Sequence, residues 1–217
     1  TIGASEAPII LGLSRFKTPY QLWAEKSQLV RASEEENEQR EWGVILEEPI
    51  ARRYAKETKR EVDAPPPRTV LTNEAYQGAS CTPDRFTLID GVWVPLELKT
   101  AHFTMGKHWR EEPPLEYVVQ VQHQMMIWGS EVGSLAGLIG GSVFQWCDIA
   151  RDAEFIGMLY EEIQKFLGRV ASGDPPPVDG TAKTREVMKK LYGRESGEVI
   201  ALPSDAMDWD AQLSEMK

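Results

Sequence analysis

The stretch CTPDRFTLIDGVWVPLELK, residues 81–99, has the pattern of a β-hairpin that carries charge at its open end. Its centre, Asp90-Gly91, is a favoured two-residue type I′ turn. With these two residues as the loop, antiparallel pairing places Asp84 opposite Glu97. Because side chains alternate along a strand, Lys99 lies on the same face as Glu97. The hairpin therefore predicts a cluster of two acids and one lysine.

Directly opposed side chains in an antiparallel pair have Cβ atoms about 4.5–5.5 Å apart, so Asp84 and Glu97 would repel each other. A divalent cation between them reverses this, and ligands that are all oxygen suit Mg²⁺ or Mn²⁺. Beside such a cation, Lys99 can orient a water or help it lose a proton, which is the arrangement for metal-assisted phosphodiester hydrolysis. Two alternatives stay open. In the first, the three residues form a solvated face with a salt bridge, an alternative that applies because short D…ExK patterns arise readily by chance. In the second, a bulge at Pro95 shifts the register by one residue.

A further acid, Glu47, interrupts a largely apolar stripe in a predicted helix that ends near Thr58. Helical spacing places it on one face with Val44, Ala51 and Tyr54. A carboxylate on a buried face needs a partner, and the metal site would supply one. Alternatively, Glu47 is a partly exposed acid that pairs with an arginine.

The strongest helical pattern covers residues 114–128, where Tyr117, Gln120 and Gln124 share one face. Glutamine amides at these positions can donate to phosphate oxygens or to the catalytic carboxylates. The alternative is a polar stripe on the surface. His123, between the two glutamines, is expected at the surface or at the edge of the core rather than as a metal ligand.

Helices, strands, a helix, strands and a helix follow in that order, which predicts an α+β fold with a mixed sheet. The DPPP run at 174–177 marks a boundary. We therefore expect one domain over residues 1–173 and a peripheral acidic extension over 174–217. The expected elements are helices over 5–10, from Thr18, over about 33–58, 114–128, 153–171 and 184–192, and strands at 69–72, 84–99 and within 132–149.

Bulk properties exclude several classes of protein. The chain has 217 residues, a formal net charge of −10 and a pI near 4.9. Its two cysteines, Cys81 and Cys147, are too few for a disulfide framework, a four-cysteine zinc site or an iron–sulfur cluster. No apolar run approaches a membrane span and no signal peptide opens the chain, so a cytoplasmic protein without a membrane partner is expected. The negative charge argues against nucleic acid, although a basic channel can lie inside an acidic exterior.

Five short motifs follow one another along the chain: IGAS at 2–5, WGVILE at 42–47, CTPD at 81–84, LELK at 96–99 and YVVQVQHQM at 117–125. In this order they resemble the lambda exonuclease/YqaJ family of viral recombination nucleases, within the PD-(D/E)XK superfamily. The D…ExK pattern alone is weakly specific, whereas the ordered set is strongly so. The resemblance implies a restriction-endonuclease-like PD-(D/E)XK core, in which helices flank a mixed central β-sheet.

The resemblance also implies roles for individual residues. Asp84 and Glu97 look like Mg²⁺ ligands, helped by the Leu98 carbonyl, and Mn²⁺ is expected to substitute. Lys99 looks like the residue that activates the attacking water. Glu47 looks like a further acid that supports the metal site, directly or through water, in a two-metal-ion mechanism.

Residues outside the acids also match positions of the family. Gln120 matches the active-site glutamine, and Gln122 is its neighbour, expected to contact DNA. Ser5 and Thr82 match positions that hold the terminal 5′-phosphate of DNA. The sequence departs from the family at Arg85, where relatives often have glycine.

The activity of the family is 5′→3′ degradation of one strand of linear double-stranded DNA, which leaves a 3′ overhang for recombination by strand annealing. Close relatives form a ring-shaped homotrimer around DNA and work with a single-strand annealing protein, so double-stranded DNA ends and that protein are the expected partners. A ring needs positive charge only in its bore. Candidates for the bore are Arg15, Lys17, Lys107 and Arg110.

Two other functions are compatible with parts of the pattern. A structure-specific endonuclease of the same superfamily would use the same acids and lysine. A non-catalytic DNA-binding or assembly subunit would not need them, and their presence argues against this reading. The Cas4-like branch, which carries an iron–sulfur cluster, is disfavoured by the two cysteines.

Overall fold

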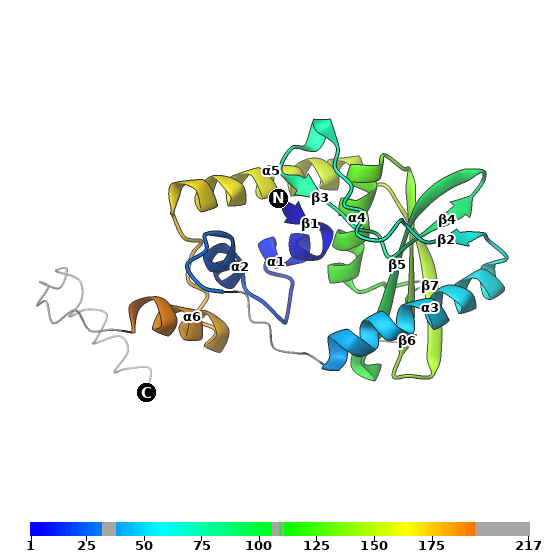
Figure 1. Ribbon diagram of the computed structural model, residues 1–217, viewed down its shortest axis with the longest axis horizontal. Coiled ribbons are helices and arrows are strands. Elements are labelled where there is room, and N and C mark those ends of the chain that lie inside the picture. Colours follow the sequence, from blue (N-terminus) through cyan, green and yellow to red (C-terminus); the bar gives the residue numbers. More distant parts are fainter. Residues whose placement is uncertain (32–37, 106–108, 110, 194–217) are drawn as a thin grey trace, which may run out of the picture.

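A five-stranded sheet forms the centre of the computed structural model, which describes residues 1–31, 38–105, 109 and 111–193 (Figure 1). The strand order is β2-β4-β5-β6-β7. Strands β5 and β6 run parallel and the other neighbours antiparallel, so the predicted mixed sheet is confirmed. The strands are β2 (Val62–Asp63), β4 (Arg85–Ile89), β5 (Val92–Ala101), β6 (Val132–Ile139) and β7 (Val143–Ala150).

Helices cover both faces of this sheet (Figure 1). Helix α3 (Glu38–Thr58) packs over Leu96 and Leu98 on one face. Helix α4 (Leu115–Trp128) packs over the opposite face. Because side chains alternate along β5, Glu97 points away from Leu96 and Leu98 and toward α4.

A second helical layer lies on the side of α4 that faces away from the sheet (Figure 1). Apolar residues of α4 there join those of the N-terminal helices and of α5 in one core cluster. The strong apolar periodicity over 153–171 predicted α5 correctly. The layer comprises β1 (Ile2–Gly3), α1 (Ala7–Ile10), α2 (Pro19–Lys26), β3 (Ala79–Ser80), α5 (Ala153–Ser172) and α6 (Ala182–Tyr192).

The hairpin at 81–99 has the predicted turn and register. Asp90 and Gly91 have φ values of 50° and 81°, as a type I′ turn requires at both positions. Pairing follows the predicted register as far as Arg85 opposite Leu96, and Pro95 lies within the ladder without a bulge. The alternative of a shifted register is therefore wrong.

The prediction of a strand at 69–72 is wrong. Leu71 makes an isolated bridge with Cys81, and no ladder extends from it in the described chain. The proline run just before it lacks the N–H groups that a ladder needs. The sheet instead gains the short edge strand β2.

The helix predicted over residues 5–10 does not begin at Ser5, because Ser5 lies inside a 3₁₀ turn, Ala4–Glu6, whose N-cap is Gly3. The Glu6 carboxylate takes the capping role, because its Oε2 accepts a hydrogen bond of 2.8 Å from the Gly3 N–H. The hydroxyl of Ser5 is thereby left at an exposed position.

Two features of α3 bear on the site. Pro49 lies inside the helix, and the helix ends at Thr58 as predicted. The predicted start at residues 33–37 lies outside the described residues. Val44, predicted on the buried face, is 61% exposed.

Helix α6 belongs to the segment predicted as a peripheral extension, and it packs on the core. Thr184 and Val187 are buried, and Val187 joins the cluster that contains Tyr20, Leu22 and Trp23 of α2. The division of the chain at residue 174 stays a prediction. Within the described residues, no helix is long and apolar enough to span a membrane.

Gly137→Ala is expected to destabilise the fold. A Cβ at this position in β6 would lie 2.3 Å from the Trp109 ring, which is fully buried over the strand. Overpacking of this kind costs about 1–3 kcal/mol, measured as the free energy of unfolding in urea. Gly168→Ala in α5 is the control, since no atom lies near its Cβ and alanine favours a helix. Equal stability of Gly137→Ala and wild type would contradict the packing.

Candidate active site

Asp84 lies one residue before β4, and its side chain is fastened to β5. Its Oδ2 accepts a hydrogen bond of 2.8 Å from the backbone N–H of Leu98. Burial raises the pKa of Asp84 well above its ordinary value, the negative charge of Glu97 raises it further, and Lys99 lowers it. The hairpin therefore brings the two acids and the lysine together, as its register predicts.

Glu97 is buried, with 2% of its surface exposed, among three donors. Its Oε1 accepts from the Nζ of Lys99 and, at 2.6 Å, from the Nε2 of Gln120. Its Oε2 accepts from the Nε2 of Gln124 at 2.5 Å. Both glutamines are buried, so they are donors to a carboxylate as predicted, and the alternative of a polar surface stripe is wrong.

Lys99 is held between negative charges and an aromatic ring. Its Nζ lies 5.4 Å from the centre of the Tyr117 ring. Burial acts to lower the pKa of Lys99, but the charges of Glu97 and Asp84 outweigh it and raise the pKa. Lys99 is therefore an ammonium at neutral pH, which can orient a water and offset negative charge on a phosphate.

Asp84→Asn is expected to stabilise the protein in EDTA at neutral pH. The folded-state pKa of Asp84 is raised above the unfolded value of about 3.9. Between the two values the folded protein binds more protons than the unfolded chain, so wild-type stability falls as the pH rises through this window. Below about pH 4 the carboxyl is protonated in both states, and the penalty vanishes.

Thermal unfolding of wild type and Asp84→Asn, from about pH 4 to about pH 8, measures this effect. Asparagine keeps an oxygen acceptor for the N–H of Leu98. The melting temperature of the variant minus that of wild type should increase as the pH rises. A difference in melting temperature that decreases with rising pH would contradict the raised pKa of Asp84.

Glu47 reaches the same cluster from α3. Burial raises its pKa, Arg85 lowers it, and Glu97 raises it again, which places Glu47 within the electrostatic range of the buried acids. Its Oε2 lies 3.6 Å from a guanidinium nitrogen of Arg85, and Glu48 lies 3.3 Å from the other. With 28% of its side chain exposed, Glu47 is both an acid paired with an arginine and a neighbour of the metal-site candidates.

The acidic side chains of the site match the way proteins bind Mg²⁺. Within the described residues, no three His, Cys, Asp or Glu side chains come close enough to form a metal cluster. Magnesium does not need one, because it is usually bound by one or two carboxylates together with waters and substrate phosphates. Asp84 and Glu97 supply two oxygen ligands whose mutual repulsion a cation would relieve, so these residues fit a hard divalent ion.

Gln124→Leu is expected to weaken the affinity for Mn²⁺ by about 10- to 100-fold, the usual cost of losing a partner that orients a metal ligand. Leucine fills the buried position but removes the donor to Glu97 Oε2. Mn²⁺ titration measures the effect, and Gln164→Leu, on α5 and bonded to the Gln77 carbonyl, is the control. An unchanged affinity in Gln124→Leu would show that Gln120 and Lys99 alone hold Glu97.

A groove with a volume of about 370 Å³ is lined by Thr100 and Ala101, the two residues that follow Lys99 on β5. Tyr117, which contacts the ammonium of Lys99, forms part of its wall. Arg15, Phe16 and Trp42 also line it, and the two aromatic side chains are 63% and 52% exposed. Among the described residues, the lining thus combines exposed aromatic rings with one guanidinium and one acid, Glu38. The sequence did not reveal the groove, because its walls come from five separate segments.

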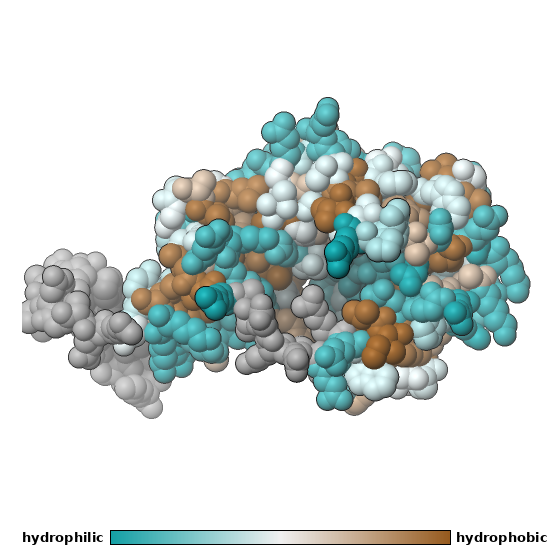
Figure 2. Space-filling model, viewed as in Figure 1, coloured by the Kyte–Doolittle hydropathy of each residue, from teal (hydrophilic) through white to brown (hydrophobic). Residues whose placement is uncertain are grey.

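Apolar side chains also reach the surface along α3. On the face drawn in Figure 2, a hydrophobic patch lies over the first half of this helix. Val44 and Ile45, which belong to that half, are 61% and 59% exposed.

Ser5 and Thr82 come to the same end of a small sheet. Strand β1 pairs in parallel with β3, with Gly3 opposite Ser80. Each predicted phosphate contact lies two residues beyond this pair, and both are exposed. Parallel strands end on the same side, so Ser5 and Thr82 lie at the same edge of the small sheet. Thr82 is two residues before Asp84 in the sequence.

Four other residues were predicted to contact DNA, and their outcomes differ. Gln122 is not available for DNA, because it is 3% exposed and its amide bridges the Ala150 carbonyl and the Asp152 N–H. Lys17 pairs with Glu25 at 2.6 Å. Lys107 and Arg110 lie outside the described residues.

His123 is not at the surface or the core edge, contrary to prediction. It is fully buried, its Nε2 lies 3.1 Å from the carbonyl oxygen of Ser80, and burial lowers its pKa to about 4. It is therefore neutral at physiological pH and belongs to the core rather than to the site.

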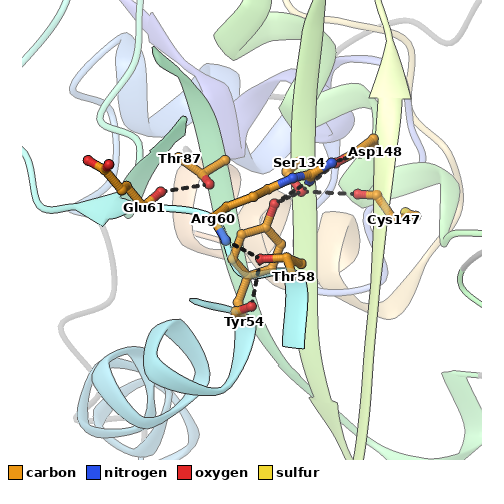
Figure 3. A network of polar contacts seen from close by, with 8 residues as sticks. All are labelled: Tyr54, Thr58, Arg60, Glu61, Thr87, Ser134, Cys147 and Asp148. Carbon is orange, nitrogen blue, oxygen red and sulfur yellow. Dashed lines mark hydrogen bonds and ion pairs between the residues drawn. The ribbon is translucent and has the colours of Figure 1, made fainter. Parts of the chain in front are cut away.

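A polar network fastens the end of α3 to the sheet (Figure 3). Arg60 forms a double hydrogen bond with Asp148, at 2.8 and 2.7 Å, and donates to Tyr54 Oη at 2.7 Å. The Tyr54 hydroxyl also lies 2.9 Å from Ser134 Oγ. Because Tyr54 lies two helical turns after Glu47 on the same face, this anchor fixes the part of α3 that carries Glu47.

The model of the YqaJ-like viral recombinase domain matches residues 1–131. A Bacillus subtilis protein described as the uncharacterized protein YqaJ is 36% identical over 206 residues, which cover 93% of this chain and 63% of that protein. The chain therefore spans just under two thirds of that relative.

Two solved structures are similar in fold. The alkaline exonuclease LHK-Exo of Laribacter hongkongensis matches with a TM-score of 0.64 at 20% identity, over 80% of this chain and 89% of that one. Its complex with dAMP matches with a TM-score of 0.64 at 19% identity, over 88% and 93%. The mixed sheet flanked by helices is the predicted PD-(D/E)XK core, which these structures share.

Proposed function

The chain belongs to the YqaJ-like viral recombinase domain family, because the model of that family matches residues 1–131, more than half of the chain. We propose that it is a divalent-cation-dependent exonuclease that degrades one strand of linear duplex DNA. The observation that carries this proposal is the pair Asp84 and Glu97 with Lys99 beside it, whose ammonium packs on Tyr117 in the wall of the groove. A structural relative is an alkaline exonuclease with a complex containing dAMP.

Asp84 and Glu97 would hold Mg²⁺ or Mn²⁺ with the Leu98 carbonyl, and Glu47 would support a second ion directly or through water. A bound cation would act as a Lewis acid that polarises the phosphoryl oxygen and favours deprotonation of the attacking water. The side chains of the protein would orient the metal ligands and the attacking water. Gln120 and Gln124 fix the carboxylate of Glu97, and Lys99 would orient the water and offset the charge that develops on the phosphate.

The groove would receive the strand that is degraded. Phe16 and Trp42 offer rings on which bases of any sequence can stack, and Arg15 offers a cation for a phosphate. Ser5 and Thr82 would hold the terminal 5′-phosphate, which would make the direction 5′→3′ and the product a 3′ overhang. This polarity rests on the two exposed hydroxyls at one edge beside Asp84.

The assembly proposed is a homotrimeric ring around duplex DNA that delivers its product to a single-strand annealing protein in recombination. In a ring the net charge of −10 would lie on the exterior, and Arg15 would face the bore. Topological enclosure would then keep the enzyme on DNA despite that charge, while added salt would still weaken initial loading.

Digestion of duplex DNA tests the proposal. Linear duplex labelled separately at the 5′ and 3′ ends, and closed circular duplex, are incubated with Mg²⁺ and with EDTA. We expect early release of the 5′ label, a persistent 3′-ended single strand, an intact circle, and no reaction in EDTA. Cutting of the circle would favour the endonuclease alternative, and an intact linear substrate in Mg²⁺ would favour a non-catalytic subunit.

A further inference from the structure

Helix α6 contacts the loop that carries Arg15 and Phe16 into the groove. Thr184 Oγ1 lies 2.9 Å from Thr18 Oγ1, where the loop ends and α2 begins, and both side chains are buried. One position earlier on α6, the Nζ of Lys183 donates to the backbone carbonyl of Arg15. The loop is thus held by α6 through its backbone and through its last side chain.

The same loop is held from its other side by α4. A guanidinium nitrogen of Arg15 lies 3.2 Å from Glu116 Oε1, and Arg15 is close enough to Tyr117 for its positive charge to act on the pKa of that hydroxyl. Tyr117 in turn packs against the ammonium of Lys99. A continuous series of contacts therefore links α6 through Arg15 to the residue placed beside the reacting phosphate.

Local contacts also hold the loop: Lys17 Nζ lies 2.6 Å from Glu25 Oε2 of α2, and the Arg15 guanidinium lies 5.3 Å from the centre of the Phe16 ring. The described internal bonds of the loop are those of Ser14 Oγ, which accepts from the backbone N–H of Phe16 at 3.2 Å and of Lys17 at 3.4 Å. Gly12 begins the loop with φ of 70°, in the left-handed region that glycine tolerates. Phe16 is 63% exposed, so its own packing contributes little order.

We propose that α6 is a brace for the substrate groove, and that Lys183 and Thr184 are positioning residues that hold Arg15 and Phe16 ready for a DNA end. The proposal rests on the proposed function for the role of the groove. It assigns a task to a helix that lies beyond the 131 residues matched by the family model. Because Thr184 is fully buried, it cannot touch DNA, and any effect of changing it must pass through Thr18 and the loop.

Thr184→Val tests the brace, since valine keeps the shape of the side chain and removes its hydroxyl. On linear duplex with Mg²⁺, KM should rise about three- to tenfold, the range for one lost hydrogen bond, while kcat changes less than about twofold. Thr184→Ser keeps the hydroxyl and should restore KM. Lys189→Met, on the exposed face of the same helix, is the control and should behave as wild type.

A double-mutant cycle separates bracing from direct contact with DNA. Lys183→Met should raise KM by a similar factor in wild type and by a smaller factor in an Arg15→Ala background, because the Arg15 side chain that it positions is then absent while Phe16 remains. Full additivity, or unchanged KM in Thr184→Val, would overturn the proposal.

Hydrogen exchange tests the role of α6 independently of any nuclease activity. In the full chain, Thr184→Val should speed amide exchange over residues 13–18 and leave β5 and β6 unchanged. If wild type proves inactive on DNA while exchange in the loop accelerates, the proposed function fails and the brace stands. If exchange in the loop is unchanged, the brace fails whatever the activity.

Discussion

Glu97→Gln is expected to abolish DNA hydrolysis, with a fall in kcat of at least about a thousandfold. Loss of a carboxylate ligand removes Lewis-acid stabilisation worth several kcal/mol, and each 1.36 kcal/mol is about tenfold in rate. The fold should survive. Gln124 has a buried Oε1 without a hydrogen-bond partner among the described residues, so its amide can turn over and accept from the new Nε2 at position 97.

Single-turnover digestion of linear duplex measures this loss, and Mn²⁺ binding followed by electron paramagnetic resonance shows whether the ligand itself is lost. Circular dichroism establishes that the variant is folded. Glu131→Gln, at an exposed position just before β6, is the matched control and should keep full activity. Wild-type rates in a folded Glu97→Gln protein would remove Glu97 from the metal site.

Lys99→Met should lower kcat by about 10²- to 10⁴-fold, the range for a group that assists proton transfer or orients the nucleophile. Methionine keeps the length of the side chain and its packing on Tyr117, so the groove should be preserved. Removal of the positive charge leaves Asp84 and Glu97 without their nearest cation. Mn²⁺ affinity should therefore stay equal or rise while hydrolysis falls.

This opposite response of binding and rate distinguishes Lys99 from the acids. Both quantities should fall together in Glu97→Gln, and only the rate should fall in Lys99→Met. Lys165→Met, which removes an exposed ion pair with Glu162 on α5, is the control. If Lys99→Met loses Mn²⁺ and activity in parallel, the lysine holds the site together and does not assist the reaction.

Local signals predicted the hairpin and the helices well. The Asp90-Gly91 turn fixes its register by itself, because left-handed backbone at two consecutive positions admits few other residues. Gly129, with φ of 84°, ends α4 for the same reason. Alternation along β5 then separates Glu97 from Leu96 without any knowledge of the tertiary fold.

Errors arose where the outcome depended on which helix face meets which element. Gln122 and Gln124 are two residues apart on α4, so they point in different directions. Only the position of β5 decides that Gln124 reaches Glu97 while Gln122 reaches the β7–α5 connection. Likewise, nothing in the sequence around residue 184 indicates a contact with Thr18.

The distances along the chain between contacting groups set an order of assembly. Glu97 meets Gln120 and Gln124 across 23 and 27 residues, whereas Thr18 meets Thr184 across 166. Closing a short loop costs less entropy than closing a long one, and domains emerge from the ribosome amino end first. The carboxylate pocket can therefore condense in the nascent chain while the groove beside it is still open. The ability to bind a DNA end would form last, once α6 has been synthesised and has packed against the loop that carries Arg15 and Phe16.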